Sequence, residues 1–167
     1  MSRYDAADIK KDRLRFTKNK PSSGLILLSI AENAFYFVSI YSSDAGGYYY
    51  RFFIVASIVY NLIFMLAAFL ASEGVKNYKL SYAYTAIVLG VLQAARIFYI
   101  PLRAHRAPNP VVGAENLNVM SNGQFCYVTA CLLISAALLI CAGVIGIQKT
   151  TTLNRYQAEL DRMKREG

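Results

Sequence analysis

Apolar residues gather in four long stretches, which polar and charged segments separate. The stretches cover residues 24–42, 52–72, 80–100 and 125–147. At about 1.5 Å of rise per residue, a helix over each stretch is long enough to cross the roughly 30 Å hydrocarbon core of a bilayer. Lipid offers no partners for unpaired backbone groups, and the stretches lack the strict alternation typical of a membrane barrel. The pattern therefore predicts an all-α fold, an integral membrane four-helix bundle.

The connections between these stretches divide the chain into three parts. A basic N-terminal segment, 1–23, precedes the four-span domain, 24–147, and a polar C-terminal tail, 148–167, follows it. Within the domain only the outer loop, 101–124, is long, so no connection has room for a separate soluble domain. In the tail, Thr152 is a candidate N-cap for a short helix.

Positively charged residues lie mostly on one side of the predicted bundle. Fourteen of the 18 Lys and Arg residues lie in the N-terminal segment, the connection between the second and third stretches, and the tail. Only three lie in the two alternate connections. Basic residues favour cytoplasmic segments, so both termini are predicted to be cytoplasmic, beside anionic lipid headgroups. The net charge of +8 does not indicate nucleic-acid binding, because the basic segments contain no recognisable nucleic-acid module.

Targeting signals in the sequence bear on the kind of membrane. The first apolar stretch is preceded by 23 residues, carries Glu32 near its middle, and is not followed by a small-x-small cleavage site. The sequence contains no Asn-x-Ser/Thr acceptor for glycosylation. We therefore expect a multi-pass protein of a bacterial plasma (inner) membrane.

Cysteine and histidine residues do not form a metal-binding or cofactor-binding pattern. The three cysteines, Cys126, Cys131 and Cys141, all fall in the fourth stretch, and the single histidine, His105, stands in the outer loop. An odd number of cysteines on one helix argues against a disulfide framework, and no Cys/His spacing is that of a zinc, haem or iron–sulfur site. The sequence predicts no metal and no cofactor.

Polar residues inside the apolar stretches are the candidate functional residues, because a charge at mid-bilayer is costly and must face protein, water or a partner. Glu32 in the first stretch shares a polar stripe at helical spacing with Ser29, Tyr36, Ser39 and Ser43. A second stripe is predicted on the third stretch, around Arg96 and Gln93. It also includes Ser81, Tyr82, Thr85 and Tyr99.

Two arrangements of the charged pair remain open. Glu32 and Arg96 pair directly if the arginine reaches across an offset between their helices. Alternatively, Arg96 extends outward to the headgroups and Glu32 bonds to Asn61, Tyr60 or a serine. The candidate ion or proton site is therefore Glu32, Asn61, Gln93 and Arg96.

Small residues on the fourth stretch predict a helix-packing face. Ser135, Ala142 and Gly146 share one side of the helix, and the last two have small-xxx-small spacing. Close approach of another helix is expected there. The pattern leaves open whether that helix belongs to this chain or to a neighbour.

Three classes of function fit these observations. The favoured one is a non-catalytic subunit or scaffold of a membrane complex, associated with another membrane protein or with itself, because no catalytic motif is present. The alternative is a small transporter or channel coupled to a proton or cation through Glu32. The third is a membrane enzyme acting on lipid, for which Glu32, His105 and Arg96 are the available participants. We assign no catalytic residue.

Overall fold

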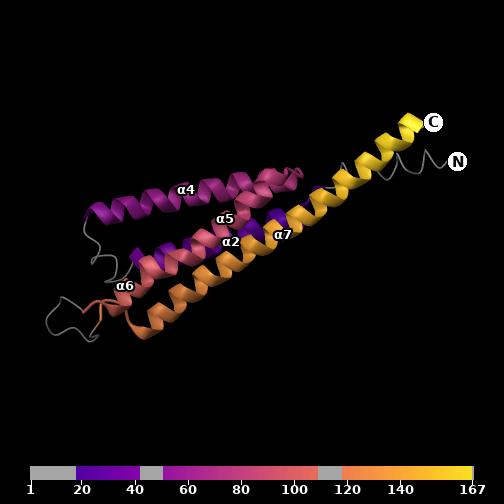
Figure 1. Ribbon diagram of the computed structural model, residues 1–167. Helices are drawn as coiled ribbons and strands as arrows, with labels where there is room; N and C mark the ends of the chain where they lie inside the picture. The colour runs from indigo at the N-terminus through magenta and orange to yellow at the C-terminus, as the bar shows by residue number, and fades with distance from the viewer. Residues whose placement is uncertain (1–17, 42–50, 109–117, 167) are drawn as a thin grey trace.

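Helices account for nearly all of the chain that the computed structural model describes, residues 18–41, 51–108 and 118–166 (Figure 1). Their bounds are Lys20–Tyr41 (α2), Arg51–Lys76 (α4), Leu80–Tyr99 (α5), Pro101–Arg106 (α6) and Asn122–Glu166 (α7). Most of the predicted basic N-terminal segment and the middle of the outer loop lie outside the described residues. Within them the all-helical prediction is confirmed.

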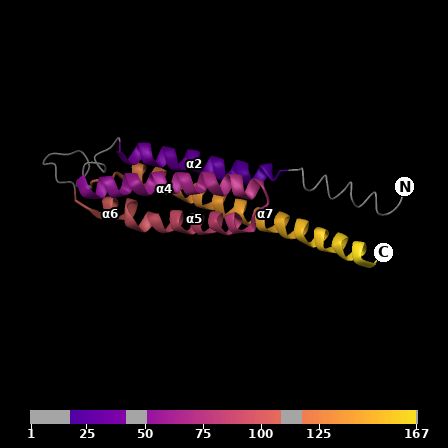
Figure 2. The ribbon, with the colours of Figure 1, turned by 90° about the horizontal axis from the view of Figure 1, so that it is seen from above.

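Four of the helices, α2, α4, α5 and α7, lie alongside one another as a bundle. Each packs against the next around the bundle, α2 on α4, α4 on α5, α5 on α7 and α7 on α2. Figure 2 shows α2, α4 and α5 side by side, with α7 passing beneath them. From α2 to α4, α5 and α7, each long helix runs in the opposite direction to the one before it (Figure 1).

Each of these four helices is long and apolar enough to cross a membrane. Their outward sides carry large apolar side chains, for example Leu62, which is 63% exposed, and Phe98, which is 69% exposed. A surface of this kind is suited to lipid rather than to water.

The turn between α4 and α5 is tighter than the sequence pattern predicts. Lys79 N–H donates to the Gly74 carbonyl (3.0 Å) and Tyr78 N–H donates to the Val75 carbonyl (3.1 Å), the bond pair of a Schellman C-cap. Tyr78 takes the left-handed conformation of this motif, with φ 57°. At the same end, the N–H of Asn19 donates to the Lys76 carbonyl (3.1 Å), which ties the start of α2 to the end of α4.

The predicted outer loop is partly helical. Pro101 lies in the first turn of α6, where its missing N–H costs nothing and its fixed φ suits a helix. Val119 N–H donates to the Ala107 carbonyl (3.0 Å), and the His105 ring stacks on Phe125 at 4.4 Å between centroids. These contacts fold α6 back onto the start of α7.

The C-terminal tail is not a separate helix. α7 runs without interruption from Asn122 to Glu166, 45 residues, and its last turns extend beyond the rest of the bundle (Figures 1 and 2). Thr152 lies inside this helix, where its hydroxyl donates to the Gln148 carbonyl (2.9 Å), so the predicted N-cap is wrong. The helix continues because no Gly or Pro interrupts it between the apolar stretch and the end of the tail.

Candidate functional site

Buried polar side chains from all four long helices meet in one cross-section of the bundle, which we call the polar layer. Its members are Ser29 and Asn33 of α2, Asn61 of α4, Gln93 and Arg96 of α5, and Ser135 of α7. All are buried, and Arg96 is only 6% exposed. Apart from Glu32 beside Asn33, the immediate sequence neighbours of each member are apolar or aromatic, so the helices bring these polar groups together within otherwise apolar spans.

Arg96 lies at the centre of the polar layer. Its Nη1 donates to Asn33 Oδ1 (3.1 Å) and its Nη2 donates to Asn61 Oδ1 (2.8 Å). The guanidinium carbon lies 4.3 Å from the centroid of the Tyr36 ring and 4.9 Å from that of Tyr60. Two amide oxygens and two aromatic faces thus surround the charge, and both kinds of group attract a cation.

The remaining bonds of the polar layer extend to α7. Gln93 Nε2 donates to Asn33 Oδ1 (2.9 Å) and lies 3.4 Å from Ser135 Oγ. The Ser135 hydroxyl donates in turn to the Ser29 carbonyl (3.0 Å). Asn61 Nδ2 donates to the Ser57 carbonyl (2.8 Å) one turn earlier in α4. A single network therefore connects all four helices.

The charge of Arg96 has no carboxylate partner among the described residues. The ion pair that the described residues do contain joins Lys76 and Glu73 at 2.8 Å, at the end of α4 and away from Arg96. Gln93 Oε1 is also buried without a hydrogen-bond partner in the described part of the chain. The layer thus holds a positive charge that only dipoles and aromatic rings offset.

Apolar side chains close the polar layer on both sides. The core on the α6 side includes Ile40, Ile100, Ala104, Val128 and Leu132. The core on the side of the α4–α5 turn includes Ile26, Phe64, Ala68, Ala86 and Leu139. The layer is therefore a narrow polar band between two apolar cores.

Glu32 is outside the polar layer, and neither predicted arrangement of the charged pair is found. Among the described residues Glu32 has no hydrogen bond or ion pair, and it is partly exposed. It lies on the α7 side of α2, close enough to Tyr127 and Cys131 to act on them electrostatically. Arg96 does not extend outward but binds Asn33, the residue that follows Glu32 and points about 100° further round the helix.

The second predicted stripe is also shorter than expected. Of its members, Gln93 and Arg96 are buried, whereas Ser81, Thr85 and Tyr99 are exposed. The Thr85 hydroxyl donates to the Ser81 carbonyl of its own helix (3.0 Å) and so needs no partner from another helix.

Asn33, which the sequence reasoning missed, is fully buried and shares its side of α2 with Ser29 and Tyr36. The helical spacing of Ser29, Asn33 and Tyr36 is the feature of the sequence from which Asn33 could have been predicted to face the interior.

The small-residue face of α7 packs inside the chain. A Cβ at Gly146 would lie 3.1 Å from the Ala83 Cβ and 3.1 Å from the Val75 Cγ1. Gly143, which the prediction omitted, approaches α5 more closely, because a Cβ there would lie 2.8 Å from the carbonyl oxygen of Ala83. Ala142 is fully buried in the same interface. The close helix approach predicted for this face is therefore made to α4 and α5 of the same chain.

An open groove runs between α2 and α7 on the outside of the bundle, with a volume of about 400 Å³. Its lining residues, apolar apart from a serine and a tyrosine, are Ala31, Ala34, Phe35, Val38, Ser39 and Tyr127. Glu32 lies beside it, about 20° round the helix from Ser39 at 100° per residue. We call this feature the α2–α7 groove.

Among the described residues, no hydrogen bond or ion pair joins Glu32, His105 and Arg96 to one another. His105 lies on α6 against Phe125, Arg96 lies in the polar layer, and Glu32 lies on the α7 side of α2. Cys126 and Cys141 are exposed and Cys131 is buried, and all three are free thiols. In the described ranges, no three His, Cys, Asp or Glu side chains gather where they could hold a metal ion.

Comparison with protein-family models, with curated proteins and with solved structures gives no match to this chain. The arrangement of its own residues is therefore the basis for any functional proposal.

Proposed function

We propose that this protein is a non-catalytic, membrane-embedded subunit that packs against another membrane protein. The observation that carries the proposal is the closed polar layer, in which the interior polar groups of four helices bind one another between two apolar cores. Such a network fixes how the helices fit together. It leaves the outer surface of the bundle as the part available to other molecules.

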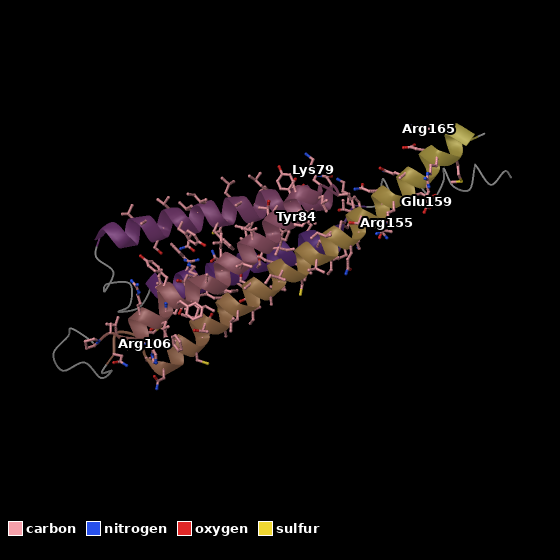
Figure 3. The ribbon with its side chains drawn as sticks, viewed as in Figure 1. Lys79, Tyr84, Arg106, Arg155, Glu159 and Arg165 are labelled. Atoms are coloured by element: carbon pink, nitrogen blue, oxygen red, sulfur yellow. The ribbon has the colours of Figure 1, made fainter. Side chains whose placement is uncertain are left out.

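The proposed orientation has both ends of the chain in the cytoplasm of a bacterial cell. Lys79 and Arg155 lie toward one end of the molecule and Arg106 toward the other (Figure 3). The described end with the α4–α5 turn and the projecting part of α7 carries most of the Lys and Arg residues. Anionic headgroups of the inner leaflet would attract that end.

A transporter or channel that uses Glu32 ranks second. Ion or proton passage needs a continuous polar route, and the two apolar cores lie across the route that the polar layer would offer. Among the described residues, moreover, Glu32 forms no hydrogen bond or ion pair with Asn61, Gln93 or Arg96. A lipid-acting enzyme ranks third, because no hydrogen bond or ion pair among the described residues joins Glu32, His105 and Arg96.

Particle composition in mild detergent tests the proposal. The tagged chain is extracted from its native membrane, and particle mass and subunit ratio are measured by light scattering and quantitative mass spectrometry. We expect a complex with one other membrane protein at a fixed ratio. A single chain that catalyses proton or cation flux in vesicles, with the flux lost in Glu32→Gln, would overturn the subunit proposal in favour of transport.

A further inference from the structure

The position of Glu32 is costly for a protein in a bilayer. It lies eight residues from the start of the first apolar stretch and ten from its end, so about 12 to 15 Å of helix separates it from either edge. Its side chain is partly exposed rather than enclosed in the bundle. A carboxylate at this depth needs a hydrogen-bond donor or an opposite charge, and none of the described residues supplies one.

The surface beside Glu32 is shaped for a helix. Ala31 and Ala34 line the α2–α7 groove, and side chains this small allow close approach of another helix backbone. Two exposed aromatic residues, Phe35 (57% exposed) and Tyr127 (50% exposed), also line it. An apolar helix seated in the groove would therefore bring its side chains to the level of Glu32.

We propose that the α2–α7 groove binds a membrane-spanning helix of a different protein, and that this helix carries a Lys or Arg at mid-membrane depth that pairs with Glu32. The inference rests on the proposed subunit function and adds that the partner's helix carries a basic residue. The charge of Glu32 selects a basic residue, and its depth selects a residue near the middle of the partner helix. The groove supplies van der Waals contact along the same helix.

A second copy of this chain is a poorer occupant. The basic residue that lies within its apolar stretches, Arg96, is 6% exposed and already donates to Asn33 and Asn61. A symmetric contact through the groove would place one Glu32 near another, and like charges repel. The partner that satisfies Glu32 therefore comes from another protein.

Synthetic helices test the charge preference. The full chain, donor-labelled, is reconstituted in phosphatidylcholine vesicles with an acceptor-labelled Leu/Ala helix of about 22 residues that has Lys at its centre. The comparison peptides have Leu or Glu at the centre, and binding is measured by energy transfer. We expect the Lys peptide to bind the wild-type chain about tenfold more tightly than the Leu peptide, and the Glu peptide to bind no better than the Leu peptide.

Two variant pairs locate the binding site. Glu32→Gln should remove the preference for Lys, whereas Glu73→Gln, which removes a carboxylate at the end of α4, should keep it. Ala31→Leu should weaken binding of the Lys peptide by filling the groove. The matched change Ala95→Leu, at an exposed position on α5, should leave binding unchanged.

The outcomes separate this inference from the proposed function. If the native complex forms but the Lys peptide shows no preference, or Glu32→Gln keeps the preference, the inference is overturned while the subunit function stands. If the particle mass instead shows that the wild-type chain is a dimer and that Ala31→Leu is a monomer, the groove belongs to a second copy. The inference is then overturned. Retention of the Lys preference in Glu73→Gln and its loss in Glu32→Gln would support it.

Discussion

Arg96 of α5 donates from Nη2 to Oδ1 of Asn61 on α4 across 2.8 Å, and this bond is a direct polar link between the two helices deep in the bundle. The donor is charged and the acceptor is a neutral amide that is 2% exposed. Charge-assisted hydrogen bonds are stronger than neutral ones, and a buried charge that loses its acceptor is costly. The position of α4 in the bundle therefore depends on Asn61.

Replacing Asn61 by alanine tests this dependence. Asn61→Ala leaves one guanidinium N–H of Arg96 without its acceptor, and we expect a loss of about 2 kcal/mol in the free energy of unfolding. The control is Asn77→Ala at the α4–α5 turn, where an exposed amide donates to the Glu73 carbonyl. Thermal unfolding in detergent measures both. Equal midpoints for the two variants would contradict the role assigned to Asn61.

Replacing Arg96 by lysine tests whether geometry matters beyond charge. The guanidinium reaches Asn33 and Asn61 at once and lies over two tyrosine rings, whereas an ammonium has no planar fork to span both amides. We therefore expect Arg96→Lys to lower the free energy of unfolding by about 1 to 3 kcal/mol. The measurement is again thermal unfolding in detergent, and a variant as stable as wild type would show that a positive charge alone suffices.

Alanine in place of Gly143 tests the close packing of α5 on α7. The added Cβ would lie 2.8 Å from the Ala83 carbonyl oxygen, so the two helices must separate and lose contact along their length. We expect a loss of about 1 to 3 kcal/mol, whereas Gly24→Ala, where nothing lies within 4 Å, should be neutral or stabilising by up to about 1 kcal/mol. Midpoints of thermal unfolding compare the two. A gain of stability in both variants would mean that α5 and α7 are not in close contact.

The orientation in the membrane is tested by labelling single cysteines in a variant whose three native cysteines are replaced by alanine. Asn122→Cys at the start of α7 and Asn77→Cys at the α4–α5 turn are both exposed and lie at opposite ends of the bundle. An impermeant maleimide added to intact cells should label Asn122→Cys only. Labelling of Asn77→Cys alone would reverse the proposed orientation.

The four long helices were predictable because each depends on a local property, namely the length of an apolar stretch. Their ends were less so. The sequence suggested a break near Thr152, but no residue there forces one, and α7 continues as a helix to Glu166. The α4–α5 turn is short because Tyr78 adopts a left-handed conformation, which a tyrosine does not reveal in advance.

The polar layer was predicted in part. Asn61, Gln93 and Arg96 were identified as intramembrane polar residues, and they do meet, but their partner on α2 is Asn33 rather than Glu32. Adjacent residues on a helix point about 100° apart, so which one faces inward depends on the rotation of α2 against its neighbours. Contacts among four helices determine that rotation, so the sequence of α2 alone does not predict it.

Because α7 is one unbroken helix, a small change of its tilt inside the bundle moves its far end by a larger distance. At about 1.5 Å per residue the helix is roughly 67 Å long, about twice the thickness of a bilayer core. Close packing on Ala83 holds it near Gly143, and about 35 Å of helix lies beyond that point. A tilt of about 5° there would carry the far end sideways by about 3 Å. Any repacking of the bundle around α7 is thus amplified at Arg162 and its neighbours.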